Sequence, residues 1–442
     1  MINNQNYIEL ENLVELIVDN RGKTVPTVSK GILLIATNCI KHSSIYPTFE
    51  NIRYINDDTY NNWFRAHLEP NDILFVNKGT PGRSCIVPTP INFVAAQDMV
   101  GLRFKKEYHP YYMLAVLRSN EIQQTIKNNY VGLVIPHYRK QELVKLKLPI
   151  LDKSKRDEIG YLYYILSKKI ELNNQINMEL EAMAKTLYDY WFVQFDFPDE
   201  NGKPYKSSGG KMVFNEVLKR EIPVGWEVKK LSAFAKTGSG GTPKSTVKEY
   251  YENGQIPWIN SGELNQPFIV KTENFISEIG LKNSSAKLFP KQTILMAMYG
   301  ATAGKTSIIS FEATTNQAIC AVMPLDKIMF YYTKHVLDDM YKYLINLSTG
   351  SARDNLSQDK IRNLDIVIPS EELSRKFCKI VTPFFRKIEI NLQENQELAQ
   401  LRDWLLPMLM NGQVSVGSGE YEREEESLGM VAESGKSKYE KI

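Results

Sequence analysis

A glycine-rich stretch that ends in a lysine is the first candidate for chemistry in this chain. Residues 300–306 read Gly-Ala-Thr-Ala-Gly-Lys-Thr, which has the composition of a phosphate-binding loop. Such a loop needs four residues between its glycines, whereas this stretch has three, and Tyr299 takes the place that the first glycine would need. We therefore predict no nucleotide site here. We expect a tight turn between strands, in which the glycines supply positive φ.

The histidines and cysteines also lack the spacing of a catalytic or metal centre. There is no His-Glu-x-x-His, no Cys-x-x-Cys and no Gly-x-Ser-x-Gly. The chain has no Pro-Pro dipeptide, so it lacks the Asn/Asp-Pro-Pro-aromatic motif of adenine methyltransferases. Four widely separated cysteines are most simply reduced thiols of a cytoplasmic protein. We predict no catalytic residues, no cofactor and no metal, which points toward binding.

Composition and charge narrow the class of protein further. The 442 residues carry a formal net charge of +3 and suffice for two or three domains. No apolar run is long enough to span a membrane, and the polar first residues indicate no signal peptide. Residues 412–442 contain seven Glu against four Lys or Arg, so we expect an acidic, disordered tail. The rest is mildly basic, which permits nucleic-acid binding without proving it.

An internal repeat organises the chain. Residues 169–180 recur 218 residues later at 387–398, with eight of twelve positions identical. Two largely apolar seams appear when positions are taken alternately three and four residues apart, one from Ile159 and one from Phe377. An apolar seam of this period indicates packing against a partner helix. Two such helices in one chain most simply pack against each other. We expect Pro383 to kink the second helix or to mark its first turn.

Both seams contain a polar pair at equivalent points: Lys169 with Asn173, and Lys387 with Asn391. One reading is a solvated face in the middle of each helix. The sharper reading is that these residues fix the register and orientation of the paired helices at some expense of stability.

The regions before the helices predict mixed domains. Short apolar runs at 73–76 and 293–296 read as strands, and 111–128 and 330–346 have helical potential. The fold class is thus α+β, with an α+β domain of roughly 150 residues in each half. We expect the following divisions: a first domain at 1–150, a first long helix at 151–195, an irregular linker at 196–224, a second domain at 225–370, a second long helix at 371–411 and the tail at 412–442.

The second half resembles the specificity subunit of type I restriction-modification enzymes, and the duplicated architecture extends this resemblance over nearly the whole chain. The first half matches less closely, at residues 20–26 and 187–192. In the second half the matching stretches are 225–228, 240–244, 250–258, 261–264, 300–305 and 350–357.

The resemblance implies two pseudo-symmetric target recognition domains, each reading half of a bipartite sequence in double-stranded DNA. The two long helices would separate them as an antiparallel coiled coil. That coiled coil would dock two methyltransferase subunits, which hold S-adenosylmethionine and methylate adenine. A motor-nuclease subunit would join for restriction. A methyltransferase must flip its base out of the stack, so a separate subunit that fixes the register on the duplex makes physical sense.

Contacts to DNA can be nominated among polar residues of turns, although a solvated surface role is at least as frequent for each. Such side chains read base edges or hold phosphates. The nominated residues are Arg21, Lys23, Lys78, Arg83, His137 and Arg139 in the first domain, and Lys244, Lys305, Arg353, Asn355 and Gln358 in the second.

The first long helix also sets a distance. Residues 154–192 would span about 58 Å if wholly helical, which is roughly one to one and a half duplex turns. Two alternatives remain open: a stand-alone sequence-specific DNA-binding regulator, and a structural coiled-coil adaptor without salt-dependent DNA binding.

Overall fold

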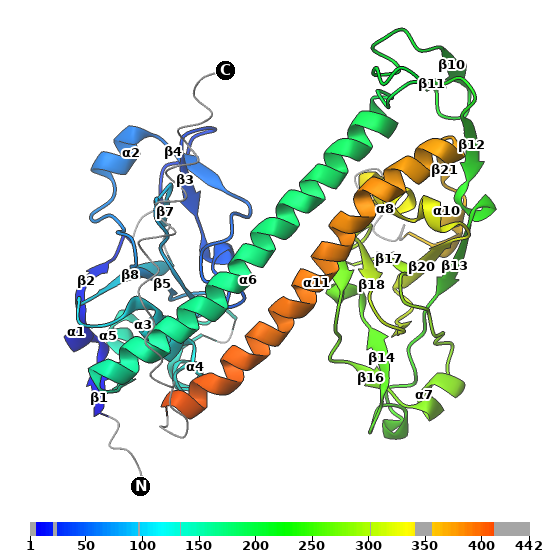
Figure 1. The fold of residues 1–442 in the computed structure, drawn as a ribbon. Coiled ribbons are helices and arrows are strands. Elements are labelled where there is room, and N and C mark those ends of the chain that lie inside the picture. Colours follow the sequence, from blue (N-terminus) through cyan, green and yellow to red (C-terminus); the bar gives the residue numbers. More distant parts are fainter. Residues whose placement is uncertain are drawn as a thin grey trace. The chain divides into compact units, whose positions relative to one another are not determined.

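The computed structural model describes residues 6–20, 24–95, 98–132, 134–300, 302–340 and 356–410 (Figure 1). The chain divides into two compact units. The first consists of Met1–Glu171 and Glu397–Ile442, and the second of Leu172–Gln396. Both mix helices with strands, as the predicted α+β class requires. No helix in the described ranges has an apolar stretch that could cross a membrane.

The described part of the first unit contains three small sheets. The main one has the strand order β2–β8–β5–β6, and a second has β4–β3–β7, in which β3 and β7 run parallel. The third pairs β1 with β9. The strands are β1 Asn6–Glu9, β2 Val14–Val18, β3 Ile32–Ile35, β4 Arg53–Ile55, β5 Ile73–Val76, β6 Ser84–Ile86, β7 Phe93–Ala95, β8 Met99–Phe104 and β9 Lys147–Ile150.

Short helices complete the first unit. They are α1 Leu10–Leu13, α2 Asp57–Asn62, α3 Pro110–Arg118, α4 Asn120–Asn129 and α5 Lys140–Val144. The sequence predicted one helical segment over 111–128, whereas the structure breaks it into α3 and α4. The break lies at Ser119, whose backbone is extended and whose Oγ accepts a hydrogen bond from the N–H of Ile122 (3.4 Å). Serine is a favoured N-cap, which explains why a new helix begins here.

The second unit repeats this plan. Its main sheet has the order β13–β20–β17–β18–β15, its second sheet β16–β14–β19, and its third pairs β12 with β21. The strands are β12 Glu227–Lys230, β13 Ala235–Ser239, β14 Ile256–Ile259, β15 Phe268–Ile269, β16 Phe275–Ile276, β17 Ile294–Ala297, β18 Thr306–Ile309, β19 Thr314–Thr315, β20 Ile319–Pro324 and β21 Asp365–Ile368. Its short helices are α7 Glu278–Lys282, α8 Phe330–Asp339 and α10 Gln358–Arg362.

Strand for strand, the two units share one topology. β2–β8–β5–β6 corresponds to β13–β20–β17–β18, and β4–β3–β7 to β16–β14–β19, again with one parallel and one antiparallel pairing. The strand β15 has no counterpart among the described strands of the first unit. The repeat found in the sequence of the helices therefore extends through the sheets.

The central strands are apolar throughout because each faces two cores. Ile73 and Phe75 of β5 belong to the core that includes α3, whereas Leu74 and Val76 belong to a separate core beside β7. β17 does the same in the second unit. Successive side chains of a strand point to opposite faces, so a strand covered on both sides reads as an uninterrupted hydrophobic run. The two strands predicted from such runs are confirmed.

Two long helices follow the third sheet of each unit: α6 Lys153–Tyr188 and α11 Glu371–Met410, green and orange in Figure 1. A π-helical turn at Asp189–Val193 extends α6. Ser370 caps α11, since its Oγ accepts a hydrogen bond from the N–H of Leu373. The negative charges of Glu371 and Glu372 in the first turn stabilise the helix by interacting with its dipole.

The prediction for Pro383 was wrong in one respect. α11 begins twelve residues earlier, so Pro383 lies inside the helix and not in its first turn. A proline at that place removes one backbone N–H and leaves the carbonyl of residue 379 without a helical donor. Lys379 and Pro383 are both exposed, which lets water take that place.

The helices pack antiparallel within each unit. In the first unit Tyr163 of α6 lies 5.5 Å from the guanidinium of Arg402 on α11. The predicted seam is one residue out of phase at its lysines: Lys169 and Lys387 are exposed, and Ile170 and Ile388 are buried instead. The prediction placed the residue after Ile159 in the seam at 162, three residues later. In the structure the next buried residue is Tyr163, four residues later, and this difference recurs at Ile170. Neither lysine therefore sits in the seam.

The linker also differs from the sequence expectation. Residues 212–223 form an antiparallel hairpin of β10 Met212–Asn215 and β11 Arg220–Pro223. Phe197 stacks between Tyr205 and Trp226, with ring centroids 4.6 and 5.3 Å away. The apolar run of Met212, Val213 and Phe214 before the turn at 216–219 is a signal that could have predicted the first strand of this hairpin.

Candidate nucleic-acid interface

The nominated residues fall into three groups. Arg21, Lys23, Arg353 and Asn355 lie outside the described residues. Lys78, Arg83, His137 and Arg139 belong to the first unit, and Lys244, Lys305 and Gln358 to the second.

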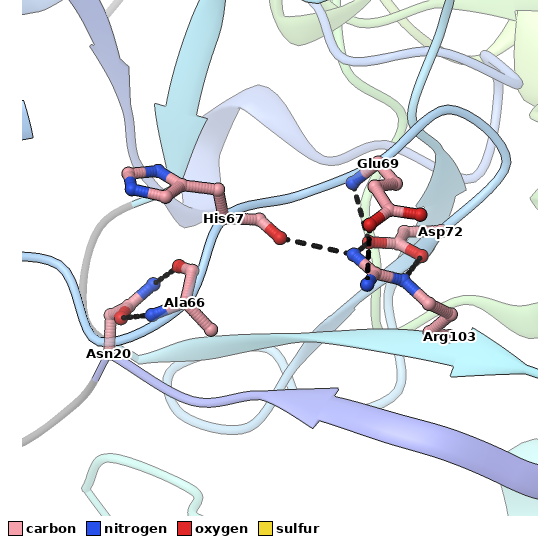
Figure 2. A network of polar contacts seen from close by, with 6 residues as sticks. All are labelled: Asn20, Ala66, His67, Glu69, Asp72 and Arg103. Carbon is pink, nitrogen blue, oxygen red and sulfur yellow. Dashed lines mark hydrogen bonds and ion pairs between the residues drawn. The ribbon is translucent and has the colours of Figure 1, made fainter.

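The chain that enters the predicted loop at Arg21 and Lys23 is firmly held. The side-chain oxygen of Asn20 accepts hydrogen bonds from the N–H groups of Arg65 (2.8 Å) and Ala66 (3.3 Å), and its amide donates to the carbonyl of Ala66 (2.9 Å). Figure 2 shows how a second clasp holds the same segment.

That clasp centres on Arg103 of β8. Its guanidinium binds both carboxylate oxygens of Asp72 at 3.0 Å, the carboxylate of Glu69 at 2.7 Å and the carbonyl of His67 at 3.1 Å (Figure 2). Asp72 is 2% exposed, and it also accepts the N–H of Glu69 (2.8 Å). A bidentate arginine–carboxylate pair fixes geometry as well as charge. The network therefore fixes the segment 65–72 on the sheet and positions the chain before Arg21.

The structure brings the other first-unit candidates together. The turn between β5 and β6 runs beside residues 136–139, because Gly79 N–H donates to the carbonyl of Pro136 (2.9 Å) and Tyr138 N–H donates to that of Asn77 (2.7 Å). Lys78 and His137 face each other in an isolated antiparallel bridge. Arg139 follows directly and is exposed. Lys78 Nζ lies 3.9 Å from Asp98 Oδ1.

Arg83 lines a cleft of about 470 Å³ beside this turn. One wall is the turn itself, another is the polar face of α4, and the third includes Tyr130 and Pro136. The wall from α4 consists of Asn120, Gln123, Gln124 and Lys127. Among the described residues, no acidic side chain lines this cleft. Arginine, lysine and amide donors without a competing carboxylate suit a phosphate oxygen.

Lys127 was not nominated from the sequence, although a signal was present. Residues 120, 123, 124 and 127 follow the i, i+3, i+4, i+7 spacing of one helix face, and all four are polar without a negative charge. Ile122 and Ile126 occupy the opposite, buried face. What the sequence could not show is that this face lines the same cleft as the turn at Arg83.

The side chains that line the cleft carry a net positive charge. Partial burial of His42, together with the charges of Arg118 and Arg83, lowers the pKa of this histidine to about 4, although part of the side chain is exposed. His42 is therefore neutral at pH 7, and the positive charge of the lining comes from Arg83 and Lys127.

Arg118, behind the cleft, is a positioning residue. Its guanidinium donates to the carbonyls of Ser84 and Ser44 at 2.6 Å, and further bonds reach those of Lys41 (3.2 Å) and His42 (3.1 Å). All four of these partners are backbone carbonyls, which are uncharged. Arg118 thus joins the loop at 41–44 to the start of β6 and adds positive charge behind the cleft.

In the second unit, Lys305 takes the place of Arg83. Val76 N–H donates to the carbonyl of Arg83 (2.8 Å), and Ala297 N–H donates to that of Lys305 (3.0 Å). Gly82 and Gly304 close the two turns by equivalent hydrogen bonds of 3.0 and 2.8 Å, although the second turn is one residue longer. Gly300 and Gly304 have φ of 84° and 80°. The predicted turn with positive-φ glycines is confirmed.

The remaining second-unit candidates divide. Lys244 is exposed in the loop that follows β13. Both polar atoms of the Gln358 amide are used within the unit: Oε1 accepts from Ser239 Oγ (2.6 Å) and Nε2 donates to Thr237 Oγ1 (3.0 Å). Gln358 thus holds α10 against β13, and this use speaks against a role in reading DNA.

The two predicted register asparagines lie buried between α6 and α11. Asn173 Nδ2 donates to Asn395 Oδ1 at 2.9 Å and to Glu394 Oε2 at 2.8 Å, and Asn391 Nδ2 donates to Asn177 Oδ1 at 2.8 Å. Residues 173 and 391 are equivalent in the repeat, as are 177 and 395, so these are the same contact made twice. Such reciprocity is the mark of a two-fold interface.

Comparison with known proteins gives this arrangement a family. Residues 223–400 match the model of the type I restriction modification DNA specificity domain. The chain is 30% identical to the HindI specificity subunit of Haemophilus influenzae, over 69% of this chain and 77% of that protein. This chain belongs to the specificity subunits of type I restriction enzymes. It is also 27% identical to the MjaIX specificity subunit of Methanocaldococcus jannaschii, over 69% of each.

The crystal structure of a type I system S subunit from M. genitalium shares the fold of this specificity subunit. The TM-score is 0.50 at 17% identity, over 92% of this chain and 96% of that one. The fold class predicted from the sequence is thereby confirmed. A specificity subunit recognises DNA sequence and is not the catalytic subunit of its enzyme. In keeping with this, burial raises the pKa of the Cys85 and Cys320 thiols to about 12, which suits packing and not nucleophilic attack.

Proposed function

We propose that this specificity subunit reads a bipartite sequence in double-stranded DNA, one half-site with each recognition domain. The observation that carries this proposal is the repetition of a single strand order in both units. Two copies of one fold present two copies of one surface, and a two-part site mirrors such symmetry. The domain limits that we propose are 1–150 and 225–370, with the linker at 196–224 and the tail at 412–442.

The long helices, at 151–195 and 371–411 in this proposal, separate the two domains and dock two methyltransferase subunits. Reciprocal contacts of Asn173 with Asn395 and of Asn177 with Asn391 support this, because a pseudo-two-fold pair of helices offers two equivalent faces. The methyltransferase subunits bring S-adenosylmethionine and methylate adenine, and a motor-nuclease subunit joins for restriction.

The contacts that we propose to DNA are those that the structure leaves available. In the first domain they are Lys78, Arg83, His137 and Arg139, to which the geometry adds Lys127. In the second they are Lys244 and Lys305. Arg21, Lys23, Arg353 and Asn355 stay predictions from the sequence alone.

The test uses the chain co-purified with its methyltransferase subunits. Mapping of methylated adenines in cells that do or do not express the chain defines the target, which we expect to be bipartite. Binding to that duplex is then measured over a range of salt concentrations for Arg83→Ala, Lys305→Ala and the control Lys219→Ala, an exposed lysine of the linker hairpin. We expect each of the first two to reduce the slope of log K against log salt by about 1, and the control to leave it unchanged.

Two outcomes would count against the proposal. A continuous target would remove the division into half-sites. Methylation that is unchanged when the gene is deleted, with tight DNA binding by the chain alone, would instead indicate a stand-alone regulator.

A further inference from the structure

Three apolar side chains stand exposed on a loop next to the cationic cleft of the first unit. Val134 is 92% exposed, Ile135 55% and Val131 39%. We call these three residues the apolar finger. Water-exposed aliphatic side chains contribute nothing to the core, so a cluster of them at the end of a loop indicates contact with a partner.

The loop is held rigidly at its base. Val131 and His137 exchange both backbone hydrogen bonds, at 2.9 and 2.7 Å, and Gly79 N–H donates to the carbonyl of Pro136 at 2.9 Å. Gly132 has φ of 93°, and a Cβ added there would lie 2.6 Å from the carbonyl oxygen of Ile135. The backbone therefore presents the finger from a fixed base, which keeps the entropy cost of binding small.

Positive charge flanks the finger on the described surface. Tyr130 and Pro136, on either side of it, line the cleft that contains Arg83 and Lys127. Lys78 is paired with His137 at the base of the loop, and Arg139 follows. Asp98 forms an ion pair with one of these cations, since its Oδ1 lies 3.9 Å from Lys78 Nζ. Cations around an apolar centre match duplex DNA, whose phosphates surround base edges that include the thymine methyl group.

The corresponding stretch of sequence in the second half has different chemistry. Tyr138 N–H donates to the carbonyl of Asn77 at 2.7 Å, and Leu356 N–H donates to that of Met298 at 3.0 Å, so Tyr138 and Leu356 occupy equivalent positions beside the sheets. The sequences that precede them read Gly-Leu-Val-Ile-Pro-His at 132–137 and Gly-Ser-Ala-Arg-Asp-Asn at 350–355. The stretch that ends at this equivalent position is thus apolar in the first half and polar in the second. Two domains that read different half-sites require such a difference in sequence.

We infer that the apolar finger of Val131, Val134 and Ile135 reads the first half-site by apolar contact with base edges, and that its ligand is the 5-methyl group of thymine. Arg83 and Lys127 hold the neighbouring phosphate. This inference rests on the proposed function and names the element that gives the first domain its sequence preference.

The experiment compares Val134→Ser with the wild-type chain in the complex with its methyltransferase subunits. Dissociation constants are measured for the mapped target duplex and for a scrambled duplex. We expect Val134→Ser to weaken target binding about tenfold, as loss of one base contact does, and to leave scrambled binding and the salt slope unchanged. Val217→Ser is the matched control, since Val217 is a valine of the linker hairpin that is 62% exposed.

A second arm tests the thymine methyl group. Uracil replaces thymine, one position at a time, in the first half-site of the duplex. At one or more positions we expect the wild-type chain to bind several-fold more weakly and Val134→Ser to show no further loss. Because Val134 is almost fully exposed, the unfolding temperature of the Val134→Ser variant should match that of the wild-type chain.

The outcomes separate the inference from the proposed function. Equal weakening of target and scrambled binding would make the finger a non-specific grip and overturn the inference. So would unchanged DNA binding with loss of methyltransferase subunits, which would make it a protein contact, or a uracil series without effect. If the wild-type complex shows no preference for any sequence, the proposed function itself fails.

Discussion

The two units use one strand order but stabilise equivalent places with different chemistry. In the first, Asp72 pairs with Arg103, next to the partnered residues Ile73 and Leu102 of β5 and β8. The equivalent residues in the second are Thr293 and Met323, where the Thr293 hydroxyl instead donates to the carbonyl of Pro290 (2.7 Å). The comparison teaches that this fold accepts an ion pair or a neutral pair at one site, provided that each buried polar atom has a partner.

The equivalent helices α3 and α8 differ in the opposite sense, because here the second unit has the charged residue. α3 carries Leu114 and Ala115, both fully buried, where α8 carries Lys334 and His335. Lys334 Nζ binds Asp338 at 2.5 Å, and the His335 ring stacks on Tyr188 with centroids 5.2 Å apart. At these two pairs of equivalent places, the first unit has a buried carboxylate beside the sheet and the second has a buried lysine on the helix.

The largest change to this pair of domains should come from lengthening both helices. Insertion of four residues after Met178 and after Gln396, equivalent points of the repeat, adds about 6 Å to each helix. We expect the unread spacer of the DNA target to grow by one or two base pairs with both half-sites retained. Methylation mapping reports this. Altered half-sites with an unchanged spacer would refute it, and insertion into one helix only should abolish methylation.

The ion pair of the first unit offers a sharper test. Asp72→Thr should destabilise that unit by about 3 kcal/mol, because Arg103 loses its buried partner. The double variant Asp72→Thr/Arg103→Met copies the second unit and should recover most of this loss. Hydrogen exchange of the segment 65–72 in the full chain measures both. A double variant as unstable as the single one would show that the two units are not interchangeable at this site.

Acid should affect the second unit through His335. Burial lowers its pKa from the ordinary 6.5 to about 4, while Asp338 raises it and Lys334, Lys185 and Asp189 also face it. The unfolded state then binds more protons between these two values, so stability is lost as pH falls through that window. We expect about 2 kcal/mol less stability at pH 5 than at pH 7, and a smaller loss in His335→Phe. Identical pH profiles from hydrogen exchange of α8 would contradict this assignment.

The smallest effect concerns the helix pair. Because Asn173–Asn395 and Asn177–Asn391 are equivalent contacts, double-mutant cycles to alanine should give similar coupling energies of about 1 kcal/mol each. Urea unfolding of the full chain supplies the values. A coupling in one pair and none in the other would show that the pseudo-symmetry of the geometry does not extend to its energetics.

Much of this architecture could be predicted from the sequence, because it rests on period and spacing. The runs at 73–76 and 293–296 and the glycine turn at 300–304 follow from the sequence alone. For Asn173 and Asn391 the sequence left two readings open, and burial with contacts between the helices favours the second. Lys127 was missed because only the folded chain brings α4 to the turn at Arg83. Lys169 and Lys387 were wrongly placed in the seam because a seven-residue repeat contains one step of three and one of four, and the sequence alone does not show which comes first. For Gln358, sequence gives the residue type but not its hydrogen-bond partners.

The turn after β17 is one residue longer than the turn after β5, yet the same backbone hydrogen bonds close both. An added residue is thus absorbed at the apex, and the pairing of the strands beneath does not slip. Evolution can therefore vary the length and chemistry of such apices while the buried framework stays intact. New target preferences can then arise by local change, without the cost of inventing a new protein core.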